Sequence, residues 1–88
     1  MARAQDIARF GSLNVAYLDL EKGETATFQG LKDPTAFVVL KGSVTINGEA
    51  ARTLRKHVHR GDVSLSASTD ALILTFAMQG DNVVRLGD

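Results

Sequence analysis

Apolar and polar residues alternate along most of this chain with a period of two, the spacing at which side chains point to one face of a β-strand. The alternation has no exception over residues 63–68, where Val63, Leu65 and Ala67 are separated by serines. No segment long enough for an amphipathic helix keeps a 3.6-residue period. The pattern therefore predicts an all-β chain, folded as a single small antiparallel β-barrel or jelly-roll-like sandwich.

Turn residues divide the alternating runs into short strands. Asn47-Gly48 is the strongest short signal for a β-hairpin, because a type I′ turn needs positive φ at both central positions. Pro34 lacks an amide hydrogen and fits a strand entrance better than a strand centre. Gly61-Asp62 predicts another turn. We expect strands at residues 13–20, 25–29, 36–40, 44–46, 53–59, 63–68, 71–78 and 83–86.

The length of 88 residues suits one compact domain, which we expect to span residues 1–88 with residues 1–6 and 87–88 frayed. Such a small domain buries little surface, so we expect a homodimer in which Ile7 and Phe10 help to extend a neighbour's sheet. The first residues carry an acid and no apolar stretch, which predicts a cytoplasmic protein without a secretory signal. The longest apolar run is far too short for a membrane-spanning helix, and the chain has no cysteine.

Basic residues gather between Glu49 and Asp62, where no acid occurs, although the formal net charge of the whole chain is zero. Clustered cations raise the local potential and favour an anionic partner. The same residues also keep a strand soluble and block edge pairing, and no aromatic side chain in the segment offers to stack on a base. The candidate anion or partner surface comprises Arg52, Arg55, Lys56, His57, His59 and Arg60.

The glycines of this chain fit the spacing of two motifs. Gly23 and Gly42 occupy the two ends of the pattern G-x5-H-x-H-x3-E-x6-G, and Gly61 opens the pattern G-x5-P-x-G-x2-H-x3-N. These patterns are the first and second motifs of the cupin superfamily, which the chain therefore resembles. The resemblance covers roughly residues 13–78 and implies a small β-barrel of the kind that usually holds a metal between several histidines.

The positions of the cupin metal ligands are filled by other residues in this chain. Gln29 and Leu31 stand where the resemblance puts the first two histidines, Thr35 where it puts the glutamate, and Leu72 where it puts the last histidine. Leucine has no lone pair, and a neutral amide or hydroxyl oxygen is a weak ligand for transition metals. We therefore expect a metal-free protein without a cofactor.

The cupin register also implies which side chains line the barrel. It points Val58 inward, so His57 and His59 are expected outside, on a solvated strand face. The tentative ligand pocket comprises Thr25, Thr27, Gln29, Thr35, Leu72, Leu74 and Phe76, with Met78 on the same face. The alternative is a filled core in which Phe28 turns inward and expels the threonines.

Three functions fit these observations. The first hypothesis is a non-catalytic cupin-like binding module for a small ligand or a macromolecular partner, with no catalytic residue. The first alternative is a metal-free enzyme resembling small nucleoside phosphorylases, in which the basic segment holds phosphate. The second alternative is an inhibitor or accessory protein that acts through the basic strand at residues 52–60.

Overall fold

Eight strands make up most of the chain. The structure is a computed structural model that describes residues 2–78 and, by their backbone alone, residues 84–87; none of these residues is helical. The strands are β1 (Arg3–Phe10), β2 (Leu13–Leu20), β3 (Thr25–Lys41), β4 (Val44–Ile46), β5 (Glu49–Ala50), β6 (Lys56–Ala67), β7 (Ala71–Met78) and β8 (Val84–Gly87). They pair antiparallel in the order β1-β2-β7-β3-β6-β4-β5, with β8 beside β3. The predicted all-β antiparallel fold is confirmed.

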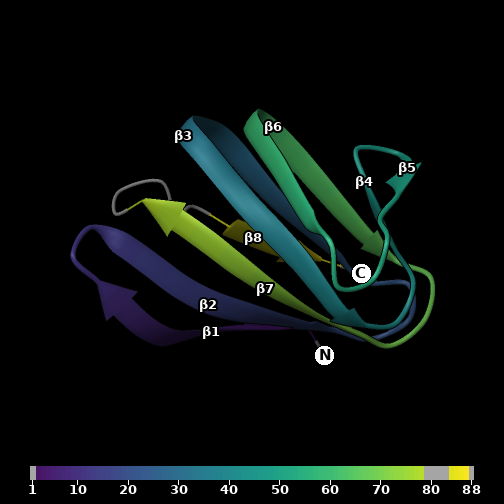
Figure 1. Ribbon diagram of the computed structural model, residues 1–88. Coiled ribbons are helices and arrows are strands. Elements are labelled where there is room, and N and C mark those ends of the chain that lie inside the picture. The colour runs from purple at the N-terminus through teal and green to yellow at the C-terminus, as the bar shows by residue number, and fades with distance from the viewer. Residues whose placement is uncertain (1, 79–83, 88) are drawn as a thin grey trace.

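The two longest strands, β3 and β6, bend and so fold the sheet into two layers. The second half of β3 and the first half of β6 extend the layer of β1, β2 and β7. The first half of β3 pairs with β8, and the second half of β6 pairs with β4. In Figure 1 each of the two long strands runs as a front arm and a back arm, with β8 behind β7. The result is the predicted small jelly-roll-like sandwich.

The core fills the space between the layers. Its buried apolar cluster consists of Leu18, Leu20, Ala26, Phe28, Leu31, Phe37, Val39, Val44, Ile46, Val63, Leu65, Ala67, Ala71 and Ile73. Phe28 and Phe37 come from the two halves of β3 and meet edge to face, with ring centroids 5.3 Å apart. Because the rings belong to different layers, this contact ties the layers together.

Several predicted elements have the bounds that the sequence indicated. The strands at residues 13–20, 44–46 and 71–78 are confirmed as β2, β4 and β7. Asn47 and Gly48 both have positive φ, 51° and 85°, as a type I′ turn requires. The alternation over residues 63–68 is also confirmed, since Val63, Leu65 and Ala67 are buried.

Other predicted boundaries were wrong because the bent strands continue through them. Residues 25–29 and 36–40 belong to one strand, β3, and Pro34 lies inside it. The register between β3 and β6 shifts at this point, so the strand needs no backbone amide of Pro34 to donate a ladder hydrogen bond. The turn predicted at Gly61-Asp62 is part of β6, because Gly61 pairs with Leu31 across the bend. Residues 3–6, expected to be frayed, pair with β2. The predictions for residues 79–83 lie outside the described residues.

The inward face predicted for the first half of β3 was wrong. Ala26 and Phe28 are buried, whereas Thr25 and Thr27 are half-buried on the opposite face and Gln29 is exposed. Burying a phenylalanine gains more free energy than burying two hydroxyl groups that need hydrogen-bond partners. The filled-core alternative therefore describes this strand.

The inward face predicted for β7 was also wrong. Ala71, Ile73, Thr75 and Ala77 are buried, while Leu72, Leu74 and Phe76 are half-buried on the outside and Met78 is exposed. Pairing with β2 sets this register, because Ile73 lies opposite the buried Leu18 and Ala71 opposite the buried Leu20. Side-chain size alone predicts the opposite orientation of β7, because its outward residues are mostly larger than its buried ones.

Gly42 stands where the turn into β4 packs against the start of β7. Its φ is +90°, and an added Cβ would come within 2.7 Å of the Ala71 Cα and closer still to the Asp70 carbonyl oxygen. Both neighbours are backbone atoms, which cannot rotate away. A glycine is therefore required at this position for reasons of packing as well as turn geometry.

Phe28→Ala should lower the free energy of unfolding by about 3–5 kcal/mol, through lost transfer energy and the cavity left beside Phe37. Thr27→Ala, on the other face of the same strand, should cost less than about 1 kcal/mol. Urea unfolding of both variants measures the difference. Equal losses would mean that the assigned faces of β3 are incorrect.

Gly42→Ala should destabilise the fold by roughly 3 kcal/mol or more, because a positive φ and a backbone clash act together. Gly48→Ala is the matched control, since Gly48 has a φ of +85° and open space around it. That variant should lose only about 1–2 kcal/mol, the cost of the left-handed conformation alone. Thermal or urea unfolding gives both values, and similar losses would exclude the clash.

Glu24 holds the start of the chain against the sandwich. Its side chain is buried, and its carboxylate accepts hydrogen bonds from the amides of Glu21 and Ala2, each at 2.7 Å. The hydrogen bond from the Glu21 amide has the largest effect and lowers the pKa of this carboxyl below its ordinary value of 4.5. Burial raises the pKa, and the hydrogen bond from the Ala2 amide lowers it further. Because the folded pKa is the lower one, the stabilisation is complete above the unfolded pKa and is lost as pH falls through the folded pKa.

Glu24→Gln should therefore lower the melting temperature at neutral pH, and its difference from the wild type should shrink as pH falls below about 4.5. Melting curves from pH 3 to pH 8 measure this convergence. Glu49→Gln, at an exposed position in β5, serves as the control and should follow the wild type throughout. A gap that is the same at every pH would show that the carboxylate charge has no role.

Candidate binding site

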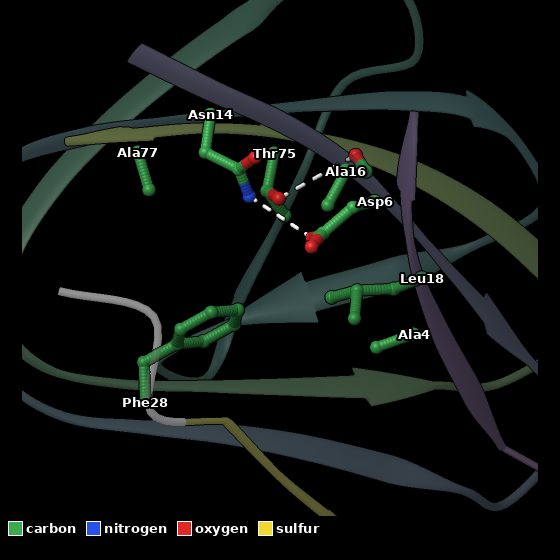
Figure 2. A pocket seen from close by; sticks show the side chains of 8 residues that line it. All are labelled: Ala4, Asp6, Asn14, Ala16, Leu18, Phe28, Thr75 and Ala77. Carbon is green, nitrogen blue, oxygen red and sulfur yellow. Dashed lines mark hydrogen bonds between the residues drawn. The ribbon is translucent and has the colours of Figure 1, made fainter. Parts of the chain in front are cut away.

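A small cavity opens between β1, β2 and β7, beside Phe28. Its walls are formed by Ala4, Asp6, Asn14, Ala16, Leu18, Phe28, Thr75 and Ala77 (Figure 2). Asn14 donates its amide N–H to the Asp6 carboxylate at 3.0 Å, and Thr75 donates its hydroxyl to the Ala16 carbonyl at 3.4 Å. Asn14 and Thr75 are both buried, so these bonds satisfy polar groups that water does not freely reach.

The volume of this cavity, about 50 Å³, limits what it holds. A water molecule needs about 10–15 Å³ measured in this way, whereas pockets for small molecules usually span about 300–1,000 Å³. A few waters therefore fit and a nucleoside does not. None of the seven tentative pocket residues lines it. Sequence reasoning missed Asn14, whose only signal was a polar residue among the apolar positions of its strand.

The positions of the cupin metal ligands do not converge on a site. Leu31 and Thr35 are buried, Gln29 is exposed, and Leu72 lies on the outer face of β7. The Thr35 hydroxyl donates to the Asp33 carbonyl at 3.4 Å. Within residues 2–78, no three His, Cys, Asp or Glu side chains are grouped as a metal ion requires. This donor set does not fit a transition metal, and the expected metal-free state stays a prediction.

The predicted basic surface lies on the first half of β6 and on the segment that precedes it. Arg52, Arg55, Lys56 and Arg60 are all exposed. No ion pair within the described part of the chain involves any of their side chains. Their exposure agrees with the positions expected for them. Whether they bind an anion stays a prediction.

The two histidines of this segment do not lie where the cupin register put them. Val58 is 50% exposed, whereas His57 and His59 are half-buried on the side that faces the core. Their pairing explains the orientation, because His57 lies opposite Phe37 and the ring of His59 is 6.2 Å from that of Phe37. The expected outward orientation of both histidines was wrong. They belong to the wall of the sandwich and leave the exposed surface to the cations.

Leu54, in the turn before β6, adds an apolar side chain near these cations in the sequence. Its φ is +61°, a value that leucine rarely adopts, and its side chain is 70% exposed. Its amide donates to the Val39 carbonyl at 2.8 Å, which holds the turn against β3. The exposed segment is therefore basic with apolar side chains at Leu54 and Val58.

Comparisons with known proteins give matches by structure alone. No known sequence family and no curated protein matches this chain. An RmlC-like cupin protein from Desulfovibrio desulfuricans superposes with a TM-score of 0.76 at 14% identity, covering 88% of this chain and 81% of that one. A cupin-2 domain containing protein from Shewanella frigidimarina gives 0.73 at 14% identity, covering 88% and 80%. Salicylate 1,2-dioxygenase from Pseudoaminobacter salicylatoxidans gives 0.70 at 23% identity, with 97% of this chain on 28% of the enzyme.

These likenesses bear on the fold and leave the activity open, since the matched structures include an enzyme and sequence identity is low. Over the described residues, no helix is long and apolar enough to cross a membrane. A TM-score of 0.76 over 88% of this chain supports a shared fold. This chain has the fold of the cupin superfamily.

Proposed function

We propose that this chain is a non-catalytic cupin-fold binding module of the cytoplasm, without a metal, that acts through its surface on an anionic macromolecule. The observation that carries the proposal is the set of four exposed cations on and beside β6, none of which has an ion-pair partner among the described residues. Clustered surface cations create a local positive potential even on a chain whose formal net charge is zero. That potential attracts an anionic partner to this part of the surface, whereas the net charge of zero gives the molecule as a whole no general attraction for anions.

The interior of the sandwich supports a surface role. Phe28, Phe37 and Ile73 fill the space between the layers, and the cavity beside Phe28 holds only about 50 Å³. A nucleoside with phosphate needs a pocket of several hundred cubic ångströms. The described residues therefore give no support to the phosphorylase alternative. The inhibitor or accessory role is the form of the proposal that agrees best with a filled core and a charged strand.

Arg55→Glu combined with Lys56→Glu should abolish retention on a polyanion and leave the free energy of unfolding within about 0.5 kcal/mol of the wild type. The reason is that these exposed side chains contribute charge to the surface and little to packing. Heparin chromatography measures the salt concentration at which each protein elutes. Exposed charges are screened over about 8–10 Å near physiological ionic strength, so elution of the wild type should respond to salt.

The matched control is Lys22→Glu combined with Lys32→Glu, which makes the same change in net charge at two exposed lysines outside the segment. This control should elute close to the wild type. Pull-downs from a native lysate with the three proteins then compare partners directly. If both double variants behave alike, net charge rather than the β6 surface decides binding, and the proposal is wrong.

A further inference from the structure

The first half of β6 is the border strand of the layer that contains β1, β2 and β7. Residues 56–59 pair with β3 on one side, whereas β4 pairs with β6 only at residues 65–67. In Figure 1 this part is the front arm of β6, which borders the layer beside β3. We call residues 56–60 the open edge of β6, because none of the described strands pairs with their other side.

The direction of the β3 backbone shows which groups of the open edge are turned outward. The Val39 carbonyl accepts a hydrogen bond at 2.8 Å from an amide of the turn before β6, so Val39 directs its backbone groups toward β6. Backbone groups alternate along a strand, so Phe37 also directs its groups toward β6, and its partner His57 directs its own toward β3. Lys56 and Val58 therefore direct their N–H and C=O groups to the open side. None of the turn and loop hydrogen bonds among the described residues uses these groups.

The side chains on the outer face of the open edge follow the order cation, aliphatic, cation. Lys56 and Arg60 are exposed, and Val58 between them is 50% exposed. His57 and His59 are half-buried on the opposite face. The open edge thus presents one apolar side chain between two positive charges, each two residues away.

The other border of the same layer, β1, is built differently. Its pairing with β2 is interrupted by a register shift after Asp6. Two of its charged side chains have partners, since Arg3 pairs with Asp19 at 2.9 Å and Asp6 accepts a hydrogen bond from Asn14 at 3.0 Å. Irregular pairing and mixed charges protect an edge strand from association. The open edge of β6 pairs regularly over residues 56–59 and carries charge of one sign, so it repels a copy of itself and attracts a strand of opposite charge.

The chemistry of the open edge fits a polypeptide better than a nucleic acid. A strand edge presents both amide donors and carbonyl acceptors, and another strand complements both. A phosphate backbone carries acceptors alone and leaves the carbonyls without partners. Surfaces for single-stranded nucleic acid also use aromatic side chains on which bases stack, and residues 49–62 contain no Phe, Tyr or Trp. The exposed side chains of Val58 and Leu54 suit the apolar side chains of a peptide.

We propose that the open edge of β6 binds an acidic segment of another protein, which adds to the sheet as an antiparallel strand. This inference rests on the proposed surface function and names the class of its partner. Strand addition to a sheet edge gains affinity from main-chain hydrogen bonds and specificity from alternate side chains. The side chains of the segment that lie opposite Lys56, Val58 and Arg60 are acidic, aliphatic and acidic. The recognised pattern is therefore acid-x-aliphatic-x-acid.

The probe is a blocked peptide with the sequence Gly-Glu-Thr-Val-Thr-Glu-Gly, and its binding is followed by amide chemical shifts of the isotope-labelled protein. The wild type should bind the peptide with a dissociation constant below about 1 mM at low salt, and binding should weaken as salt rises. The amide signals that shift should be those of the open edge and of the residues beside it.

Two N-methylated forms of the peptide separate strand pairing from charge attraction. With the peptide valine opposite Val58, the valine amide faces β6 and the amides of both threonines face away. One N-methyl group on the valine amide should weaken binding at least about tenfold, because it removes a hydrogen bond and separates the strands. One N-methyl group on the next threonine amide should weaken binding less than about threefold. The two forms have the same charge and mass, so they are matched controls for each other.

Val58→Pro tests the same hydrogen bond from the side of the protein. It removes an amide hydrogen from the open side, where proline is tolerated in a strand, and leaves all the cations in place. Peptide binding should weaken at least about tenfold, while the variant elutes from heparin at the same salt concentration as the wild type. Val58→Thr keeps the amide and the strand preference and should bind the peptide within about threefold of the wild type. If Val58→Pro fails to fold, the two N-methylated peptides decide the test.

Equal binding of the two N-methylated peptides overturns the inference, because it shows that charge alone attracts the peptide. Retention on heparin without peptide binding at about 1 mM also overturns it and leaves the proposed surface function intact. If single-stranded oligodeoxythymidine binds where the peptide does not, and Val58→Pro leaves that binding unchanged, the surface belongs to nucleic acid and the inference is wrong. Absence of both heparin retention and peptide binding contradicts the proposed function as well.

Discussion

The continuous pairing of β3 with β6 is the constraint on which the rest of the structure depends. The two strands stay paired from Thr25 with Ser66 to Val38 with Lys56, through register shifts near Leu31 and Thr35. Because the pair bends as one ribbon, each strand contributes to both layers. The contact of Phe28 with Phe37 then closes the bend from inside. Such pairings of distant residues bring a large entropic cost of loop closure, which the core has to offset.

The pairing of β3 with β6 also limits the space that is left inside the sandwich. Once Ala26 and Phe28 face inward on β3, and Ile73 faces inward opposite Leu18, little space is left between the layers. The polar groups that remain inside, such as Asn14 and Thr75, are hydrogen-bonded within the chain. A cupin fold is compatible with many functions, and this one combines a largely filled interior with a segment of exposed cations.

Much of the fold was predictable from local patterns. Asn47-Gly48 and the serine alternation after Val63 specify their strands because turn geometry and burial agree there. The continuation of β3 through Pro34 and of β6 through Gly61 was not predictable, because both depend on a partner strand that is distant in sequence. Proline and glycine usually end a strand, so the local pattern predicts a turn at each of these positions. In this structure both residues are irregular positions inside the ladder, at the bend.

The candidate site was predicted less well than the fold. The exposed cations of the basic segment were identified correctly, because charge can be read directly from the sequence. The predicted orientation of His57 and His59 was wrong, since both side chains face the core rather than the solvent. On β7 both alternating sets are apolar or nearly so, and the choice between Leu74 and Ile73 is made by pairing with β2. When both faces of a strand are apolar, alternation alone does not say which one is inside. That ambiguity is the reason why the inward face of β7 was predicted wrongly.

The wall of the cavity on the side of β1 has a dynamic consequence. Ala4 and Asp6 come from a strand that pairs only with β2 among the described elements and whose side chains are mostly exposed. A strand with so few buried contacts has a small free energy of local opening compared with the core strands. Each opening breaks the contact between Asp6 and Asn14 and admits bulk water to the cavity. The volume accessible to a small solute is therefore a time average governed by the opening equilibrium of β1, and it exceeds the volume of the closed structure.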